Sequence, residues 1–339
     1  MRVLVTGGCG FIGSHTVVAL LEAGHDPCVI DDLRNSKRGV LDRIETITGR
    51  RPPLQETDLT DPSATADAIG QVEPEATIHF AGLKHVREST EVPLLYYQTN
   101  LAALLNVLAG LDAIGSLRMV FSSSGSVYGK ADELPIPEDA PHRPTNPYSS
   151  TKSIGEHILR DLCDRSAWSV TALRYFNPAG AHPTGLIGED PAGLLSNLLP
   201  VLMHLAAGTL EEMEIFGSDF DTPDGFGVRD YVHVDDVATA HVRAVEALES
   251  RSGFQALNIG RGEGVSVMEM VRMVERVTGL GLNVRISDRK PGDVDALYAD
   301  TSLAAKHLGS LDYQDIETMC RDAWNWQRNN PEGYYLQLV

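Results

Sequence analysis

The stretch Val3-Leu4-Val5-Thr6-Gly7-Gly8-Cys9-Gly10-Phe11-Ile12-Gly13 decides the fold of this chain. Its first four residues have the β-branched and aliphatic character of a buried strand, and glycines then recur at intervals of three. Gly7 permits a tight turn, Gly10 lets the backbone approach a bound phosphate, and Gly13 lets a helix lie close to the strand. The pattern predicts a strand, a phosphate-binding turn and a helix from Ser14 to about Ala23.

Asp31 ends the next predicted strand, Val29-Ile30-Asp31. A carboxylate at this distance from the glycines accepts hydrogen bonds from the adenosine ribose of a dinucleotide and repels a 2′-phosphate. The predicted helix between them offers free N–H groups and the positive end of its dipole to a pyrophosphate. Together these features predict a βαβ unit that binds NAD in preference to NADP.

Composition narrows the class of protein. The chain has 339 residues, of which 42% are hydrophobic and 22% charged, as expected for a soluble globular protein with one large domain or two unequal ones. Lys and Arg number 28 against 47 Asp and Glu, so the formal net charge is −19. That charge disfavours nucleic acids and anionic membranes as partners. The most apolar helical run, Leu101 to Leu111, is interrupted by Asn106 and Gly110, and we expect it to be too short to span a membrane.

The four cysteines are scattered without a CxxC pair, which predicts reduced thiols in a cytoplasmic protein. The first predicted strand also leaves no room for a signal peptide ahead of it. We expect no metal site. The run His233-Val234-Asp235-Asp236 resembles a ligand cluster, but it is predicted to begin a helix through an aspartate cap.

Strands and helices alternate along the first half of the sequence, which predicts an α/β fold with a Rossmann-type, doubly wound parallel sheet. After Asn177-Pro178 the sequence is richer in glycine and proline. We therefore expect an NAD-binding domain over residues 1–177 and a smaller α/β domain over residues 178–339 that exchanges segments with it. The further strands expected are Leu54 to Thr57, Thr77 to Phe80, Met119 to Phe121 and Ser169 to Arg174, and the further helices are Val40 to Thr48, one starting near Pro62, Tyr96 to Ile114 and Tyr148 to Leu162.

Tyr148 and Lys152 are the strongest candidate catalytic pair, because residues four apart on a helix lie on one face. A nearby ammonium favours the phenolate, so we expect Lys152 to lower the pKa of Tyr148 and make it a general base. The run Ser122-Ser123-Ser124-Gly125-Ser126 follows a predicted strand, at the sheet edge where ligands bind. Ser124 is predicted to pass a proton between substrate and Tyr148, with Ser122 and Ser126 as alternatives.

These motifs resemble the extended short-chain dehydrogenases/reductases and, within them, the UDP-glucose 4-epimerases. The resemblance runs from TGGCGFIG through the later blocks His79 to Lys84, Tyr148/Lys152, Arg174 to Pro178, Gly188 to Asp190, Gly227 to Tyr231 and Trp324 to Gln327. It implies a redox-neutral exchange of UDP-glucose and UDP-galactose in galactose metabolism. Tyr148 takes the proton of the sugar O4, C4 gives a hydride to tightly bound NAD⁺, the 4-keto sugar turns over, and the hydride returns.

The resemblance also implies the ligand contacts. The residues expected to bind NAD are Gly7, Gly10, Phe11, Ile12, Gly13, Asp31, Asn35, Asp58, Phe80, Ala81, Lys84, Asn100, Ser122, Tyr148, Lys152 and Tyr175. The residues expected to bind the nucleotide sugar are Ser124, Asn177, Asn197, Leu198, Phe216, Arg229, Lys290, Asp293 and Leu297. Two of the latter are cations, which a diphosphate requires in so acidic a chain.

Several positions depart from the family pattern. Lys290 stands where an arginine is usual, and the adjacent Arg289 is an alternative phosphate ligand. His85 and Arg87 replace small residues, where a cation either changes the sugar pocket or pairs at its rim. Leu297 has a side chain of intermediate bulk, so the sequence leaves acceptance of N-acetylated hexoses open.

Three functions are compatible with the motifs. The first is the epimerase, acting as a homodimer in which Tyr96 to Ile114 and Ser149 to Leu162 form a four-helix contact. The second is another nucleotide-sugar enzyme, such as a 4,6-dehydratase, a decarboxylase or a uronate epimerase. Dehydratases carry Asp-Glu where this chain has Gly125-Ser126, which argues against them. The third is a nicotinamide-sensing regulator, against which the intact pair of Tyr148 and Lys152 argues.

Overall fold

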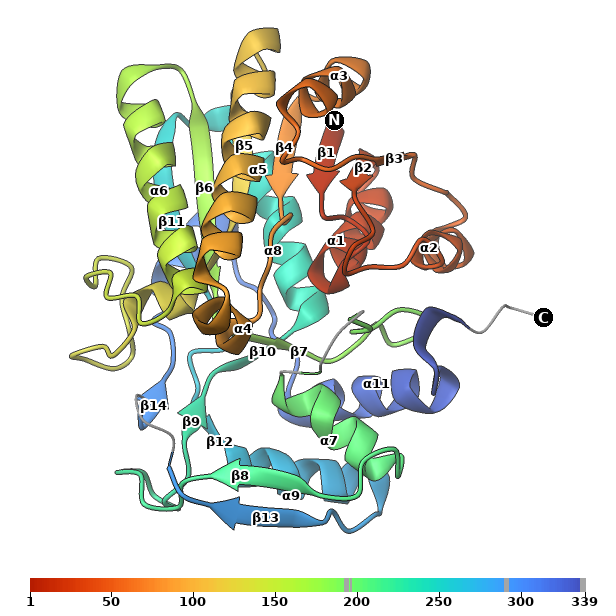
Figure 1. Cartoon of the computed structure of the whole chain (residues 1–339), viewed down its shortest axis with the longest axis vertical. Coiled ribbons are helices and arrows are strands. Elements are labelled where there is room, and N and C mark those ends of the chain that lie inside the picture. Colours follow the sequence, from red (N-terminus) through yellow and green to blue (C-terminus); the bar gives the residue numbers. More distant parts are fainter. Residues whose placement is uncertain (192–194, 196, 290–292, 336–339) are drawn as a thin grey trace.

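The computed structural model describes all residues except 192–194, 196, 290–292 and 336–339. Its centre is a seven-stranded parallel sheet in the order β11-β6-β5-β4-β1-β2-β3 (Figure 1). The predicted α/β fold with a doubly wound parallel sheet is confirmed. The strands are β1 (Arg2–Thr6), β2 (Asp26–Asp31), β3 (Leu54–Glu56), β4 (Ala76–His79), β5 (Arg118–Ser124), β6 (Ser169–Tyr175) and β11 (Gly253–Ile259).

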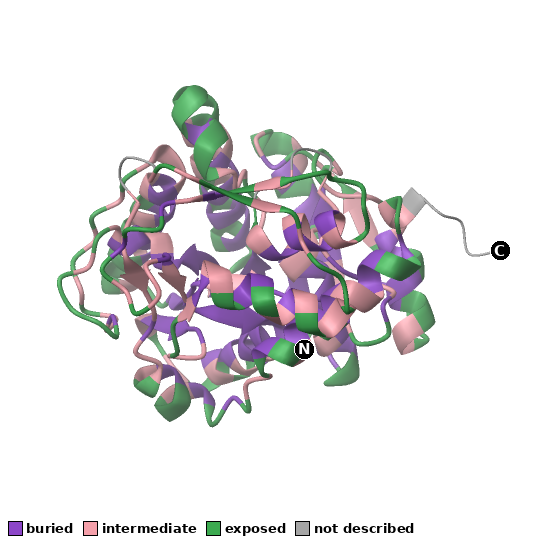
Figure 2. Cartoon of the chain, turned by 90° about the horizontal axis from the view of Figure 1, so that it is seen from below, coloured by how far each residue is buried: buried purple, intermediate pink, exposed green. Residues whose placement is uncertain are grey.

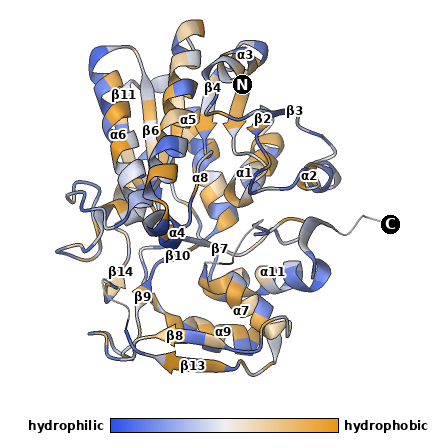
Figure 3. Ribbon diagram, in the orientation of Figure 1, coloured by the Kyte–Doolittle hydropathy of each residue, from blue (hydrophilic) through white to orange (hydrophobic). Residues whose placement is uncertain are grey.

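Helices cover both faces of this sheet, and the alternation of side chains along β1 shows why. Val3 and Val5 belong to one apolar core, whereas Leu4, which points to the opposite face, belongs to another. Figure 2 shows the buried residues in the interior, and Figure 3 shows β1 and β2 as hydrophobic strands. The first core lies under α1 (Phe11–Glu22), α2 (Val40–Thr48) and α8 (Val234–Ala247), and the second lies under α3 (Pro62–Val72), α5 (Pro93–Ile114) and α6 (Pro147–Arg165).

Among the boundaries that differ from the prediction, two bear on the site. Helix α1 begins at Phe11 rather than Ser14, because Gly10 already serves as its N-cap in an extended conformation. Strand β5 continues through Ser124, so the serines belong to the strand end itself, and the 3₁₀ helix η1 (Gly125–Tyr128) follows directly. The first turn of α1 therefore lies within the glycine motif.

Helix α5 bears on the expectation about membranes. It has 22 residues and is the one described helix that is long and apolar enough, by length and composition, to cross a membrane. The run Leu101 to Leu111 is only part of this helix, so the expectation made for that run does not apply to the whole helix. The helix packs against α3 and α6, and 44% of its apolar window is buried.

The lower part of the molecule is smaller and has its own apolar core between α7 (Leu198–Ala206), α9 (Val267–Thr278) and α11 (Ile316–Asn329) (Figure 1). The parallel pair β8 (Met213–Phe216) and β13 (Val284–Ser287) lies beside these helices. Strand β9 (Val228–Arg229) pairs with β12 (Val265–Ser266) and β14 (Ala296–Leu297), and β10 (Tyr231–His233) pairs with β7 (Asn177–Ala179). The short helices are α4 (Val86–Glu91), α10 (Ser302–Leu308), η2 (Leu248–Ser250) and η3 (Gly333–Tyr335).

The start of α8 corrects another prediction. The N-cap is His233 rather than an aspartate, since its Nδ1 accepts a hydrogen bond from the backbone N–H of Asp235 at 3.1 Å. Asp235 and Asp236 occupy the first turn instead.

Candidate active site

A cavity of about 870 Å³ opens at the carboxyl ends of the strands of the large sheet, between that sheet and the lower part. Ligands of open α/β sheets bind at this edge. The structure gathers most of the predicted site residues there. They are Gly7, Gly10, Phe11, Ile12, Gly13, Asp31, Asn35, Asp58, Phe80, Ala81, Lys84, Ser122, Ser124, Tyr148, Lys152, Tyr175, Asn177, Asn197, Arg229, Asp293 and Leu297.

Three predicted residues do not line the cavity. Leu198 begins α7, and Phe216 ends β8. Asn100 lies behind the wall, where its Oδ1 accepts a hydrogen bond from Leu83 N at 2.7 Å and its amide donates to Leu83 O at 3.0 Å. It therefore holds the loop that follows β4. Lys290 lies outside the described residues.

The glycine turn has the geometry expected of a phosphate cradle. Gly7 has φ +70°, and a Cβ there would lie 2.8 Å from the backbone N of Ala81, while a Cβ on Gly13 would lie 2.3 Å from the carbonyl oxygen of Gly7. A Cβ on Gly10 would meet only Gly7 O, at 3.3 Å. Gly10 thus leaves open space at the N-terminus of α1, where an anion is favoured.

Asp31 closes this part of the cavity. Its Oδ2 accepts a hydrogen bond from Cys9 N at 3.0 Å, and its Oδ1 accepts from Leu33 N at 2.9 Å and from Ser36 Oγ at 2.7 Å. Burial raises the pKa of this carboxyl, although these three bonds act against the shift. A carboxylate has about four acceptor positions, so one remains for a ribose hydroxyl.

Helix α6 carries the candidate catalytic pair. The predicted cap is present, since Asn146 Oδ1 accepts from Ser149 N at 2.9 Å and Pro147 occupies the first turn. The Ser124 hydroxyl lies close enough to Tyr148 for its hydrogen bonding to lower the pKa of the phenol. Lys152 Nζ lies 5.9 Å from the centroid of the Tyr148 ring and donates to the carbonyl of Ser122 at 2.7 Å.

The predicted effect of Lys152 on Tyr148 is wrong for this structure. Burial raises the pKa of Tyr148, and only the hydrogen bond from Ser124 lowers it. Burial also lowers the pKa of Lys152 to about 8. The ammonium bonds to the Ser122 carbonyl, so in the chain without ligands desolvation outweighs the attraction between ammonium and phenolate.

The serines of β5 have separate partners. Ser122 Oγ accepts a hydrogen bond from Tyr175, and Ser126 Oγ donates to Ser124 Oγ at 2.9 Å. Ser124 is therefore the serine of this run that interacts with Tyr148, and Ser126 interacts with Ser124.

Glu189 was missed among the candidate site residues, although it lies within the block Gly188 to Asp190 quoted for the family resemblance. It lines the cavity and accepts hydrogen bonds from Lys84 Nζ at 2.7 Å and Asn197 Nδ2 at 2.9 Å. One carboxylate thus joins a residue expected to bind cofactor to a residue expected to bind substrate. The signal in the sequence was an acidic residue in a chain segment otherwise rich in glycine and proline.

Two cations reach the cavity from the lower part. Arg229 donates to the carbonyls of Val228 at 2.8 Å and Val294 at 3.1 Å, and burial lowers its pKa. Arg289 bonds to Asp295 at 2.8 Å and lies 4.0 Å from the centroid of the Phe220 ring. Arg289 therefore lines the cavity, as it must if it binds the phosphate in place of Lys290.

The departures at positions 85 and 87 lie outside the cavity lining. The Arg87 side chain is 93% exposed and pairs with Glu91 at 3.1 Å, whereas Val86 between the two positions lines the cavity. Of the two readings of this segment, the pairing at the rim is the one that the structure supports.

The chain matches the model of the NAD dependent epimerase/dehydratase family over residues 3–260. It is 47% identical to the UDP-glucose 4-epimerase of Bacillus subtilis, over 98% of this chain and 99% of that protein, and 44% identical to the human one, over 99% of each.

Solved structures agree. One is titled a UDP-glucose-4-epimerase from Stenotrophomonas maltophila with bound NAD and formylated UDP-arabinopyranose; it is 43% identical, with a TM-score of 0.95 over 98% of this chain and 99% of that one. Another, from Bifidobacterium longum in complex with NAD⁺ and UDP, is 42% identical, with a TM-score of 0.94 over 98% of this chain and all of that one. The chain belongs to the NAD dependent epimerase/dehydratase family and, within it, to the UDP-glucose 4-epimerases.

Proposed function

We propose that this chain interconverts UDP-galactose and UDP-glucose with a tightly held NAD⁺. One observation carries the proposal: Ser124, Tyr148 and Lys152 line the same cavity as the glycine cradle and the guanidinium of Arg229. A base for a sugar hydroxyl, a dinucleotide site and a cation for a diphosphate are thereby within one enclosure. The two relatives named above are both called UDP-glucose 4-epimerase.

The residues fit NAD. The space at Gly10 and the N-terminus of α1 suit a pyrophosphate, and the remaining acceptor position of Asp31 suits an adenosine ribose. When bound, the cofactor takes a hydride from the sugar C4 and gives it back. Its course would be lined by Asn35, Asp58, Phe80, Lys84 and the other predicted residues that line the cavity.

Tyr148 is the base in this proposal. It takes the proton of the sugar O4 and returns it after the hydride has come back, so the cycle balances without an external reductant. Burial raises the pKa of Tyr148, so that pKa must fall before the phenol can ionise. Positive charge in the cavity and the ammonium of Lys152 favour that ionisation, and Ser124 carries the proton between O4 and the phenol.

The lower part would hold the nucleotide sugar. Arg229 and Arg289 supply the charge for the diphosphate, and Leu297 lies in register with Arg229 between β14 and β9, so its bulk faces the same ligand. We assign residues 1–177 mainly to the cofactor and 178–339 mainly to the nucleotide sugar, with α8 and β11 returning to the large sheet.

We also propose a cytoplasmic homodimer. Helices α5 and α6 lie side by side and expose Leu94, Leu95, Leu105 and Ile154, which are 38–66% exposed. Apolar side chains in that number on adjacent helices suit a four-helix contact with a second copy. Light scattering tests this, and a monomer at micromolar concentration would contradict it.

The activity test is an incubation with UDP-galactose without added reductant. Formation of UDP-glucose without net NADH supports the epimerase. A 4-keto-6-deoxy product would indicate a dehydratase, and NAD binding without turnover of any UDP-hexose would indicate a regulator. UDP-N-acetylgalactosamine in a parallel reaction measures whether Leu297 admits the larger sugar.

Tyr148→Phe tests the assigned base. We expect it to keep bound NAD and to lose about 10²- to 10⁴-fold in turnover, the usual range for a general base. Tyr97→Phe is the matched control, since it removes a hydroxyl that does not line the cavity. Full activity of Tyr148→Phe would remove Tyr148 from this role.

A further inference from the structure

Three segments far apart in the sequence meet at one wall of the cavity. They are Lys37 in the loop after β2, the strap formed by Gly188, Glu189 and Asp190, and Tyr334 in η3. The strap and Tyr334 line the cavity together with Gly10 and Asp31 of the cradle. The strap, Tyr334 and the cradle therefore border the same cavity.

Asp190 is the centre of the contact. Its carboxylate accepts hydrogen bonds from Lys37 Nζ at 2.9 and 2.8 Å and from the backbone N–H of Tyr334 at 2.8 Å. The side chains of Lys37 and Asp190 are only 15% and 14% exposed. A charge pair with this little solvent is screened far less than a surface pair, so it resists opening.

Tyr334 fastens the other end of the strap. Its hydroxyl donates to the carbonyl of Gly188 and accepts from the N–H of the same residue, both at 3.0 Å. Its ring lies 4.8 Å from that of Trp326, centroid to centroid. Gly333 has φ +67°, and a Cβ there would lie 2.2 Å from Asp190 Oδ2, so only glycine fits beside the carboxylate.

The strap also reaches across the cavity. Glu189 accepts a hydrogen bond from Lys84, in the loop after β4, and from Asn197. The strap is thus tied to the large sheet at two loops, through Lys37 and Lys84, and to the C-terminal part through Tyr334.

We propose that Lys37, Asp190 and Tyr334 form a clasp that holds the strap closed over bound NAD and slows its release. The inference rests on the proposed function, because a cycle that reduces and reoxidises its cofactor works only if the cofactor stays for many turnovers. The three are positioning residues, since the contacts that define the clasp join them to one another and to the strap. Opening the clasp frees the strap from two of its attachments at once.

Cofactor exchange tests the clasp directly. Purified holoenzyme is mixed with excess isotope-labelled NAD⁺, and the label that becomes protein-bound is followed over time. We expect Asp190→Asn to accelerate exchange by at least about tenfold, the equivalent of ~1.4 kcal/mol. Tyr334→Phe, which removes only the hydroxyl, should accelerate it to a smaller extent, and Lys37→Met combined with Asp190→Asn should add little to either alone.

The controls separate retention from damage to the fold. Arg38→Ala removes a neighbouring cation whose partner, Glu56, is exposed, and it should leave exchange at the wild-type rate. The unfolding midpoint is measured for every variant, and turnover per bound NAD should stay at the wild-type value in Arg38→Ala. Wild-type exchange rates in both Asp190→Asn and Tyr334→Phe would overturn the clasp while leaving the proposed function intact, whereas a wild-type protein that binds no NAD would overturn the function itself.

Discussion

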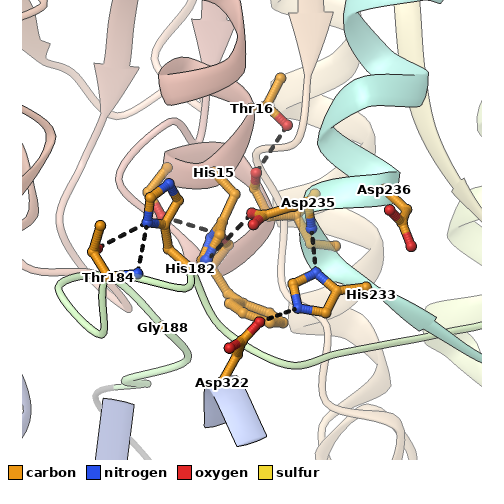
Figure 4. A network of polar contacts seen from close by, with 12 residues as sticks. His15, Thr16, His182, Thr184, Gly188, His233, Asp235, Asp236 and Asp322 are labelled. Atoms are coloured by element: carbon orange, nitrogen blue, oxygen red, sulfur yellow. Dashed lines mark hydrogen bonds and ion pairs between the residues drawn. The ribbon is translucent and has the colours of Figure 1, made fainter. Parts of the chain in front are cut away.

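Two buried polar clusters stand behind the active site and differ in how completely they are paired. The α6 cluster consists of Ser123, Tyr128, Glu156, Arg174 and Asn258. The α8 cluster consists of His15, His182, His233, Asp235 and Asp322, where α1, α8 and α11 meet (Figure 4). Both join segments far apart in the sequence, but only the first forms a closed network of hydrogen bonds.

In the α6 cluster, Arg174 donates from Nε and Nη2 to the two oxygens of Glu156, at 2.8 and 2.6 Å. Its Nη1 donates to Tyr128 Oη at 2.7 Å, and Tyr128 donates onward to Asn258 Oδ1 at 2.6 Å. Burial alone would raise the pKa of Glu156, but the bonds from Arg174 lower it. The pair is therefore charged and satisfied.

In the α8 cluster the contacts are longer. His15 Nε2 lies 4.0 Å from Asp235 Oδ1, and His233 Nε2 lies 3.3 Å from Asp322 Oδ2. Among the described residues, neither of these two nitrogens has a partner with hydrogen-bond geometry. No hydrogen bond among the described residues of this cluster therefore compensates the burial of these two nitrogens.

The difference shows which part of the site each cluster supports. Glu156 lies one turn beyond Lys152 on α6, and Ser123 precedes Ser124 on β5, so the complete network fixes the two elements that carry the candidate catalytic residues. The incomplete one lies behind the first turn of α1, where the His15 ring meets the edge of Phe11 at 5.2 Å between centroids. We therefore expect mutations in the α6 cluster to change the free energy of unfolding most at neutral pH. In the α8 cluster we expect that free energy to depend mainly on pH.

The largest expected effect is that of Glu156→Gln. It keeps the shape but leaves the guanidinium of Arg174 as an unpaired buried charge, which costs about 3–5 kcal/mol of unfolding free energy. Urea unfolding of the wild type and the variant measures it. The matched control is Glu91→Gln, which breaks the exposed pair with Arg87 and should leave the unfolding curve unchanged. A loss below about 1 kcal/mol for Glu156→Gln would show that the network is not closed as described.

Parts of this picture follow from sequence because their signals are local. The glycine spacing predicts the cradle, Asn146 and Pro147 predict the start of α6, and the four-residue spacing of Tyr148 and Lys152 places them together. Each depends on backbone geometry within one or two turns. The family resemblance adds residues of the lower part, most of which line the cavity.

The remainder depends on contacts between distant segments. Asp190 meets Lys37 across 153 positions, and Glu189 meets Lys84 across 105, so no periodicity reports them. The sign of the shift in the pKa of Tyr148 depends on burial and on where the Lys152 ammonium bonds, and neither is visible in a spacing. The sequence predicts an aspartate cap for α8, and only the geometry shows that His233 is the N-cap.

A smaller effect is expected for His233→Ala, which removes the cap of α8 and the contact to Asp322. Loss of an N-cap costs ~0.5–2 kcal/mol of unfolding free energy, and we expect a loss in this range because His233 Nε2 makes no hydrogen bond with a described residue. His233→Asn retains a capping side chain without the second contact and should recover part of the loss. Equal losses in the two variants, measured by urea unfolding, would exclude the cap as a contributor.

The smallest effect at neutral pH, and the one that grows in acid, is that of Asp235→Asn. Burial raises the pKa of Asp235 to about 7, helped by Asp236 and Asp322, while His233 acts against the shift. The folded chain therefore binds a proton there that the unfolded chain releases, and this stabilises the fold as the pH falls below 7. Burial lowers the pKa of His15 to about 3, which has the opposite sign, so the two effects cancel between about pH 4 and 6.5.

Asp235→Asn leaves the His15 effect uncompensated. Relative to the wild type, the variant should lose up to ~1.4 kcal/mol of unfolding free energy per pH unit between pH 7 and 4, with no further pH dependence of the difference above pH 8. Urea unfolding at pH 8, 6.5 and 5 measures this slope, and Asp161→Asn, an exposed carboxylate on α6, is the control. A difference between variant and wild type that stays constant over this range would mean that Asp235 is ionised in the folded chain, and the contrast between the two clusters would then lie in geometry alone.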